Sequence, residues 1–116
     1  MDLETLRQRL EDFADEREWD QFHSVRNLLL ALVGEIGEVS ELLQWVSDDV
    51  VEEFLSAGGR KRLGEELADV LLYVVRLADK SGVNLSAALE AKLESNAARY
   101  PVERSKGSAK KYTELG

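Results

Sequence analysis

The sequence of 116 residues contains no cysteine, one proline and one histidine. Without cysteine the chain has no disulfide framework, no thiolate metal site and no cysteine nucleophile. Long apolar runs are also missing, because the stretches at 28–39 and 70–77 are too short to span a bilayer and contain charged residues. Residues 1–18 are rich in charge and lack the apolar core of a signal peptide. We therefore expect a cytoplasmic protein that does not contact membranes.

Charge is unevenly distributed along the chain. The net charge is −8, which disfavours binding to a nucleic acid polymer because its phosphates would be repelled. Residues 99–116 nevertheless carry a net charge of +3, so the first 98 residues carry −11. An acidic centre with a basic tail suits a small polyanion bound through a divalent cation, whereas a merely solvated tail is the equally simple alternative.

Helical periodicity extends over most of the sequence, and no segment alternates with the period of a strand. Ser24 and Asn84 are candidate N-caps, and Asp49 with Glu52 has the spacing of a capping box. A break is expected at the paired glycines 58–59, and another before Pro101. The pattern predicts helices at 2–18, 24–46, 49–57, 60–80 and 85–99, followed by an extended segment at 101–116.

These helices predict an all-α fold, a four-helix-bundle-like packing with one short additional helix. One domain is expected over residues 1–100, with 101–116 as its basic C-terminal tail. The helices at 24–46 and 60–80 are apolar over a wider arc than a small bundle can cover, which favours a homo-oligomer. A monomer with a broad core remains the alternative.

Two acidic pairs lie within the two most apolar helices. Glu35 and Glu38 are three residues apart, as are Glu66 and Asp69, so each pair shares one side of its helix. Antiparallel packing would bring four carboxylates together, an arrangement that requires cations, and oxygen ligands favour Mg²⁺ or Mn²⁺. His23 lies outside both pairs, which removes the Glu-x-x-His motif of di-iron bundles. Solvated helix faces are the alternative interpretation.

Aromatic and basic residues accompany the acidic pairs. Tyr73 and Trp45 recur on the faces of the two pairs, and Trp19 precedes the helix at 24–46, so the three could stack on a nucleobase. Taken alone, a residue of this kind is more often an ordinary core residue. On the helix at 85–99 a polar stripe could bind phosphates or simply face solvent. This stripe consists of Lys92, Asn96 and Arg99.

Taken together, these segments resemble the MazG-like all-α NTP pyrophosphohydrolase superfamily, and within it the dCTP pyrophosphatase branch. The resemblance covers nearly the whole chain in order. Its segments are 16–23 (EREWDQFH), 26–38 with the first acidic pair, Gln44-Trp45, 65–73 with the second acidic pair, 99–101 (RYP) and 111–115 (KYTEL). Two departures are Gly34, where the superfamily often has Glu, and Leu10, where animal relatives are expected to have a pocket histidine.

The resemblance implies a Mg²⁺-dependent enzyme that converts a dNTP to dNMP and pyrophosphate as a homodimer or homotetramer. It implies that the metal ligands are Glu35, Glu38, Glu66 and Asp69. Residues around the base and sugar would be Trp19, His23, Trp45 and Tyr73. Residues that hold phosphates would be Lys92, Asn96, Arg99, Lys111 and Tyr112.

For the reaction we expect hydrolysis between the α and β phosphates, with Glu38 as the carboxylate that orients or deprotonates the attacking water. Three alternatives stay open from sequence. The enzyme could be directed at dUTP or phosphoribosyl-ATP, the chain could bind nucleotides without turnover, or it could be a structural helical oligomer.

Overall fold

The computed structural model describes residues 1–115, and over that range it contains helices and no strands. The predicted all-α class is confirmed. Residues 1–83 and 84–116 form two compact units, which we describe separately. The elements of the first unit are α1 (Leu3–Glu16), η1 (Asp20–Phe22), α2 (Val25–Leu43), η2 (Asp48–Val50), α3 (Val51–Phe54), η3 (Leu55–Gly59) and α4 (Arg60–Lys80).

Side-chain caps fix where α1 and α2 begin. The Asp2 carboxylate accepts a hydrogen bond from the Thr5 amide at 2.7 Å, which starts α1. The Ser24 hydroxyl accepts one from the Asn27 amide at 3.0 Å, as predicted for α2. Each cap satisfies an amide that the first turn of a helix leaves without a backbone partner.

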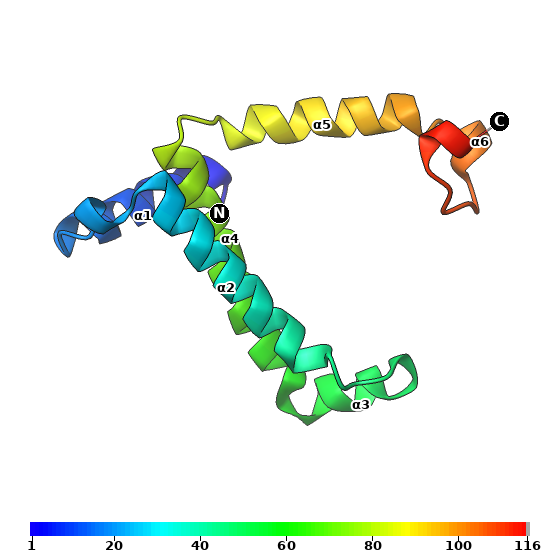
Figure 1. Ribbon diagram of the computed structural model, residues 1–116, viewed down its shortest axis with the longest axis horizontal. Coiled ribbons are helices and arrows are strands. Elements are labelled where there is room, and N and C mark those ends of the chain that lie inside the picture. The colour runs from blue at the N-terminus through cyan, green and yellow to red at the C-terminus, as the bar shows by residue number, and fades with distance from the viewer. Residues whose placement is uncertain (116) are drawn as a thin grey trace. The chain divides into compact units, whose positions relative to one another are not determined.

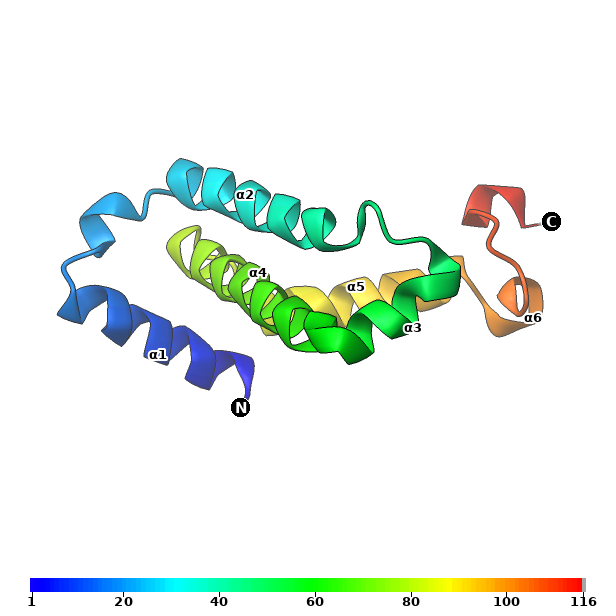
Figure 2. The same ribbon diagram turned by 90° about the horizontal axis from the view of Figure 1, so that it is seen from below.

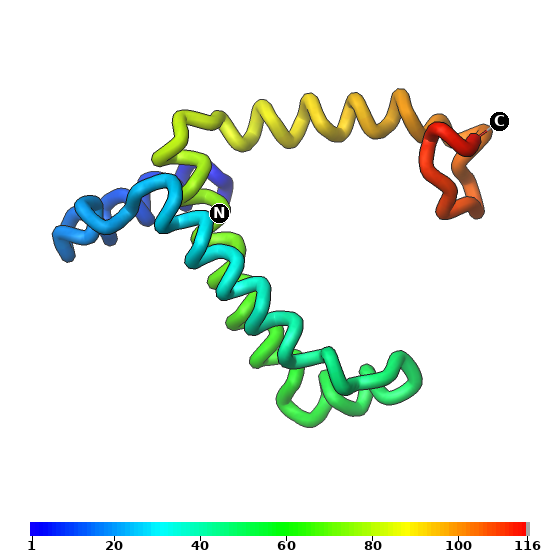
Figure 3. The backbone as a smooth tube through the Cα atoms, viewed as in Figure 1, coloured from blue at the N-terminus to red at the C-terminus, as the bar shows by residue number. Residues whose placement is uncertain are grey.

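Helices α2 and α4 lie side by side and antiparallel, and α1 packs against α4 (Figures 1 and 2). The chain reverses direction between α2 and α4 through α3, as the backbone path in Figure 3 shows. This antiparallel pairing is the feature that the two acidic pairs predicted. It brings the middle of α2 opposite the first half of α4.

The segment between α2 and α4 differs from the predicted helix at 49–57. A 3₁₀ turn at 48–50 precedes a single turn of α3, and neither has a side-chain cap. The predicted capping box at Asp49 is therefore wrong, because the Asp49 carboxylate is bonded to the Ser47 hydroxyl instead. The predicted break is confirmed at Gly58, whose φ of 99° interrupts the helical path. Next to it, a Cβ on Gly59 would lie 2.5 Å from the Phe54 ring.

The core of the first unit lies where α1, α2 and α4 meet. Ala14, Leu28, Val75 and Ala78 are its buried apolar side chains. α1 ends in a turn in which Glu18 adopts a φ of 55° and the Trp19 amide donates back to the Ala14 carbonyl at 2.8 Å. This turn directs Trp19 toward the core region, where its ring meets Phe13 edge to face at 5.7 Å.

Much of the apolar surface of the first unit is exposed. Along α2, Leu30, Val33 and Ile36 are each more than half exposed, and Leu67 of α4 is 51% exposed. This agrees with the wide apolar arcs read from the sequence. None of the helices in the described part of the chain combines the length and apolar content needed to cross a bilayer.

The second unit contains α5 (Leu85–Arg99), α6 (Val102–Ser105) and η4 (Tyr112–Glu114). The predicted cap is confirmed, because the Asn84 side chain accepts from the Ala87 amide at 3.0 Å. The prediction of an extended segment after residue 100 is wrong, since two short helical turns interrupt it. Pro101 supplies the N-cap position of α6, where its missing amide hydrogen costs nothing. Whether 1–100 is one folding domain stays a prediction.

Candidate metal centre and adjoining pocket

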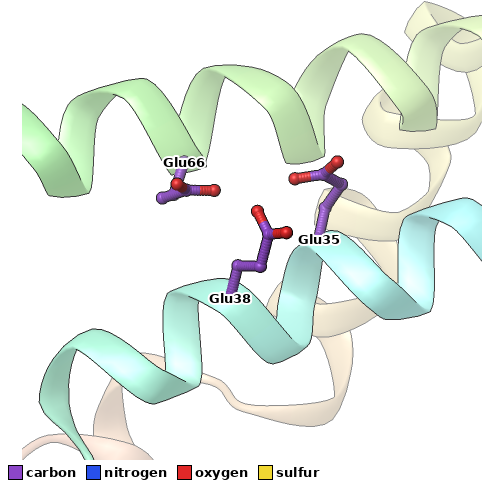
Figure 4. Close-up of side chains that lie close together, drawn as sticks. All are labelled: Glu35, Glu38 and Glu66. Carbon is purple, nitrogen blue, oxygen red and sulfur yellow. The ribbon is translucent and has the colours of Figure 1, made fainter.

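Three of the four predicted ligands converge between α2 and α4. Glu35 and Glu38 extend from α2, and Glu66 extends from α4 into the same space (Figure 4). One carboxylate oxygen of each lies within 4.8 Å of the other two. The spacing of three residues places the first two acids on one side of α2, and the antiparallel packing adds the third.

No cationic side chain in the described part of the chain forms an ion pair with these carboxylates, and two of their oxygens are buried without a partner. Glu35 Oε2 and Glu66 Oε2 are both buried and accept no hydrogen bond. Among residues 1–115, the ion pairs of 4.0 Å or less involve other acids and none of these three. Unpaired buried carboxylate oxygens are costly, and native proteins retain them chiefly where a ligand completes the site.

The closeness of the acids to one another raises the pKa values of two of them. Burial raises the pKa of Glu35, and the nearby Glu38 and Asp69 carboxylates raise it further. A hydrogen bond shared with Glu38 raises the pKa of Glu66, with burial and the charges of the neighbouring acids adding to the effect. Both shifts arise because several negative charges occupy one small volume.

A divalent cation fits this cluster on three grounds. The two oxygens without partners supply ligand atoms that no hydrogen-bond donor among residues 1–115 uses. The donor set consists of carboxylate oxygens alone, which suits hard cations such as Mg²⁺ or Mn²⁺. The third ground, electrostatic, is that a cation would offset the repulsion that raises these pKa values.

An apolar pocket of about 170 Å³ lies next to the cluster, between α1, α2 and α4. It is lined by Leu10, Phe13, Ala14, Trp19, His23, Leu28, Asp69, Leu72, Tyr73 and Arg76. Asp69 connects the two regions, because it lines the pocket and its charge also raises the pKa values of Glu35 and Glu66. The pocket therefore offers aromatic walls with one end near the carboxylates.

The structure brings together only some of the residues that were predicted to surround the base and sugar. Trp19, His23 and Tyr73 line the pocket, and the Trp19 and His23 rings meet edge to face at 6.5 Å. Trp45 does not line it and is 89% exposed just beyond the end of α2. Asp69 is outside the group of three converging carboxylates. Its assignment as a ligand, and that of Trp45 as a base contact, stay predictions.

The predicted phosphate-binding residues belong to the second unit. Within that unit the Arg99 guanidinium lies over the Tyr112 ring, 5.1 Å from its centroid, and Tyr100 meets the same ring edge to face. Their role in binding phosphates stays a prediction, as does that of the remaining three, Lys92, Asn96 and Lys111.

Sequence reasoning missed Arg76, which is only 5% exposed and lines the pocket. Its guanidinium donates to Asp20 Oδ1 at 2.9 Å and to His23 Nδ1 at 3.1 Å. A signal was available, because Arg76 interrupts an apolar run and falls on the same helical stripe as Asp69 and Tyr73. A charged residue within such a run is expected to have partners in the core.

Comparisons with known proteins agree with this geometry. The model of the MazG-like family matches residues 31–115, which include all the converging carboxylates. The Rattus norvegicus protein dCTP pyrophosphatase 1 is 51% identical over 114 residues, covering 97% of this chain and 67% of the relative. The Homo sapiens protein of the same name is 48% identical over 114 residues, with the same coverage of each chain.

A solved structure gives independent support for the fold. The crystal structure of a pyrophosphatase from Archaeoglobus fulgidus superposes with a TM-score of 0.77 at 35% sequence identity. The match covers 84% of this chain and 91% of that one. The resemblance read from the acidic pairs and their flanking segments is thereby confirmed. A matched family model over most of the chain, relatives sharing half of its residues and a common helical fold lead to one conclusion: this chain belongs to the MazG-like family.

Proposed function

We propose that this protein is a Mg²⁺-dependent nucleoside triphosphate pyrophosphohydrolase. Its substrates would be dNTPs, with dCTP or a modified dCTP favoured, and its products dNMP and pyrophosphate. The observation that carries the proposal is the group of unpaired carboxylates between α2 and α4, set beside an aromatic pocket of nucleobase size. The names of the relatives, dCTP pyrophosphatase 1, support the choice of substrate.

The geometry supports a separate role for each of the acidic side chains. Glu35, Glu38 and Glu66, with Asp69 beside them, would hold Mg²⁺, which when bound neutralises charge on the phosphate oxygens. Glu38, the most exposed of the three converging acids, is our candidate for the group that takes the proton from the attacking water. Water oxygen then bonds to the α phosphorus, the bond to the bridging oxygen breaks, and pyrophosphate leaves.

The pocket would position the rest of the substrate. Trp19 and Tyr73 provide aromatic surfaces for the base, and His23 adds a polar contact among them. Trp45 is a further candidate for stacking on the base. The candidates for binding the phosphates stay the five residues chosen from the sequence, namely Lys92, Asn96, Arg99, Lys111 and Tyr112.

The exposed apolar face of α2 supports assembly into a homodimer or homotetramer. Leu30, Val33 and Ile36 form this face, and a second copy would remove it from water. A substrate drawn from the nucleotide pool, together with the lack of cysteine, favours a cytoplasmic location.

The test is a nucleotide panel with product identification. The purified protein is incubated with Mg²⁺ and each of dCTP, 5-methyl-dCTP, dUTP, dTTP, dATP, dGTP and phosphoribosyl-ATP, and the products are separated by ion-exchange chromatography. We expect dCMP and pyrophosphate from dCTP, with the fastest turnover on a cytosine nucleotide. Release of dCDP and orthophosphate would reject the assigned bond.

The same panel separates the alternatives. Fastest turnover of dUTP or phosphoribosyl-ATP would reassign the substrate while keeping the reaction. Thermal stabilisation by dCTP without any product would indicate a nucleotide-binding module, and no response to either Mg²⁺ or nucleotide would indicate a structural oligomer.

A further inference from the structure

Arg76 is the buried charged side chain of the first unit, and its partners account for its burial. Besides its bonds to Asp20 and His23, the guanidinium lies 3.5 Å from Asp79 Oδ2. Asp79 also lies 3.4 Å from Arg7 of α1. Two carboxylates and one imidazole therefore surround the guanidinium, which compensates for the loss of water around it.

The bond to His23 determines where the imidazole carries its proton. An Arg guanidinium donates hydrogen bonds and cannot accept them, and it stays protonated in proteins. The contact from Arg76 Nε to His23 Nδ1 therefore requires Nδ1 to be the unprotonated, accepting nitrogen. A neutral imidazole of this kind holds its proton on Nε2. Burial and the charge of Arg76 also lower the pKa of His23, in agreement with a neutral ring.

The second ring nitrogen is the one left for a ligand. His23 lines the pocket together with apolar and aromatic side chains such as Leu10, Phe13 and Tyr73. Within residues 1–115, Nε2 of His23 makes no hydrogen bond, whereas Nδ1 is engaged by Arg76. An N–H group held in one orientation in a largely apolar lining is the kind of polar group that small-molecule sites use to select for an acceptor atom.

We propose that Arg76 is a positioning residue: by bonding to Nδ1 it holds His23 in the tautomer protonated on Nε2, so that the pocket offers a fixed hydrogen-bond donor to an acceptor atom of the nucleobase. Such acceptors are a carbonyl oxygen or an unprotonated ring nitrogen. The identity of the ligand rests on the proposed function. The tautomer does not, because it follows from contacts within the protein alone.

The surroundings of His23 allow the effect of the hydrogen bond from Arg76 to be separated from the effect of a nearby positive charge. Asp20 raises the pKa of His23, while Lys80 lowers it from the same helix as Arg76. Lys80 Nζ lies 2.7 Å from Asp20 Oδ1 but makes no bond to the ring. Asp69 and Tyr73 are the other titratable groups of the pocket lining. Removing Lys80 thus removes a nearby cation and leaves the Nδ1 contact in place.

The experiment uses ¹⁵N NMR of the imidazole in the full-length protein. His23 is the one histidine of the chain, so its signals need no assignment by mutation. At pH 7.5 we expect an unprotonated Nδ1 and a protonated Nε2 in the wild type and in Lys80→Met. Arg76→Met should give a mixture of tautomers and a His23 pKa higher than in the wild type. Arg76→Lys keeps a charged donor but not the forked guanidinium that bonds Asp20 and His23 together, so it should restore the wild-type pattern only in part.

Kinetic measurements with dCTP then test whether the tautomer of His23 affects substrate binding. Michaelis constants for dCTP are measured with Mg²⁺ for the same variants, and we expect KM to rise about tenfold in Arg76→Met with a smaller change in kcat, as for loss of one hydrogen bond. Lys80→Met should stay near the wild-type value. Addition of α,β-imido-dCTP should shift the Nε2 proton resonance in the wild type.

Each outcome has a distinct meaning. A proton on Nδ1 in the wild type, or an unchanged tautomer in Arg76→Met, would overturn the positioning role even if dCTP is hydrolysed. The expected tautomers without turnover of any nucleotide would reject the proposed function instead. An altered tautomer with an unchanged KM would show that the donor does not contact the base. Should Arg76→Met fail to fold, the wild-type spectrum and Arg76→Lys still decide the question.

Discussion

Two clusters of ionisable side chains lie on one stripe of α4. They differ in whether cationic side chains offset the charge of the carboxylates. At one end, Glu66 meets the two α2 acids and no cation. About ten residues further along, or about 15 Å, Arg76 and Lys80 meet Asp20 and Asp79. One cluster is neutralised within the chain, and the other is left with a net negative charge.

The difference distinguishes a cluster that is neutralised within the chain from one that the proposed metal ion would neutralise. In the cluster around Arg76 each acid has a cation within 4 Å, so it supports the fold without further components. In the cluster around Glu66 the acids raise one another's pKa values, so metal-free folding works against repulsion. The proposed Mg²⁺ site would account for the excess of acids in the cluster around Glu66, beside a cluster around Arg76 that needs no added ion.

The largest effect is expected from removing one charge of the acidic cluster. Glu38→Gln should lower turnover of dCTP about a thousandfold, because the carboxylate would serve as ligand and proton acceptor. Steady-state release of pyrophosphate measures it. Glu41→Gln is the matched control, since it makes the same change one turn further along α2 at an exposed position outside the cluster. Near-normal turnover in Glu38→Gln would remove Glu38 from the site.

Mg²⁺ should stabilise the protein through the same cluster. At a hundredfold excess over the dissociation constant, a bound ion contributes about 2.7 kcal/mol, which corresponds to a rise in Tm of about 10 °C for a domain of this size. Differential scanning fluorimetry at constant ionic strength measures the shift. Glu66→Gln should lose most of it and Asp79→Asn should keep it. An equal rise in all three proteins would place the ion elsewhere.

The metal-free protein should show the electrostatic cost of the acidic cluster through pH. Because folding raises the pKa of Glu35 above its usual value near 4.5, folding is opposed once that carboxyl must ionise. The cost is absent below the unfolded pKa and grows as pH rises through the folded pKa. Glu35→Gln should therefore be more stable than the wild type at pH 8 in EDTA, with the difference vanishing toward pH 4. Urea unfolding at each pH provides the measurement, and a pH-independent difference would contradict the cause.

In the cluster around Arg76, the change of stability with pH should have the opposite sign and be smaller. The hydrogen bond from Lys80, with the charge of Arg76, lowers the pKa of Asp20, so its carboxylate stabilises the fold above the unfolded pKa of 3.8. This stabilisation is lost as pH falls through the folded pKa. Asp20→Asn should thus be less stable than the wild type at pH 7, and the gap should close in acid. A variant more stable than the wild type at pH 7 would show that the pair is not stabilising.

Local sequence already determined the main helices and half of the site. Ser24 and Asn84 predicted their helix starts, because a cap acts on amides within three residues. The pairing of Glu35 with Glu38 on one face required only the helical period. The family could also be identified from motifs in order along the chain, and the matched family model confirms it.

Other features depended on how the helices pack. The Asp49 cap prediction was wrong because Ser47 bonds that carboxylate, and Trp45 is exposed although its spacing placed it on the face of the acidic pair. The periodicity of one helix cannot state the register or crossing of its neighbour, which decides whether a side chain meets a partner or water. Only the tertiary structure joined Arg76 to His23, because the two residues lie 53 positions apart in the sequence and meet where η1 contacts α4.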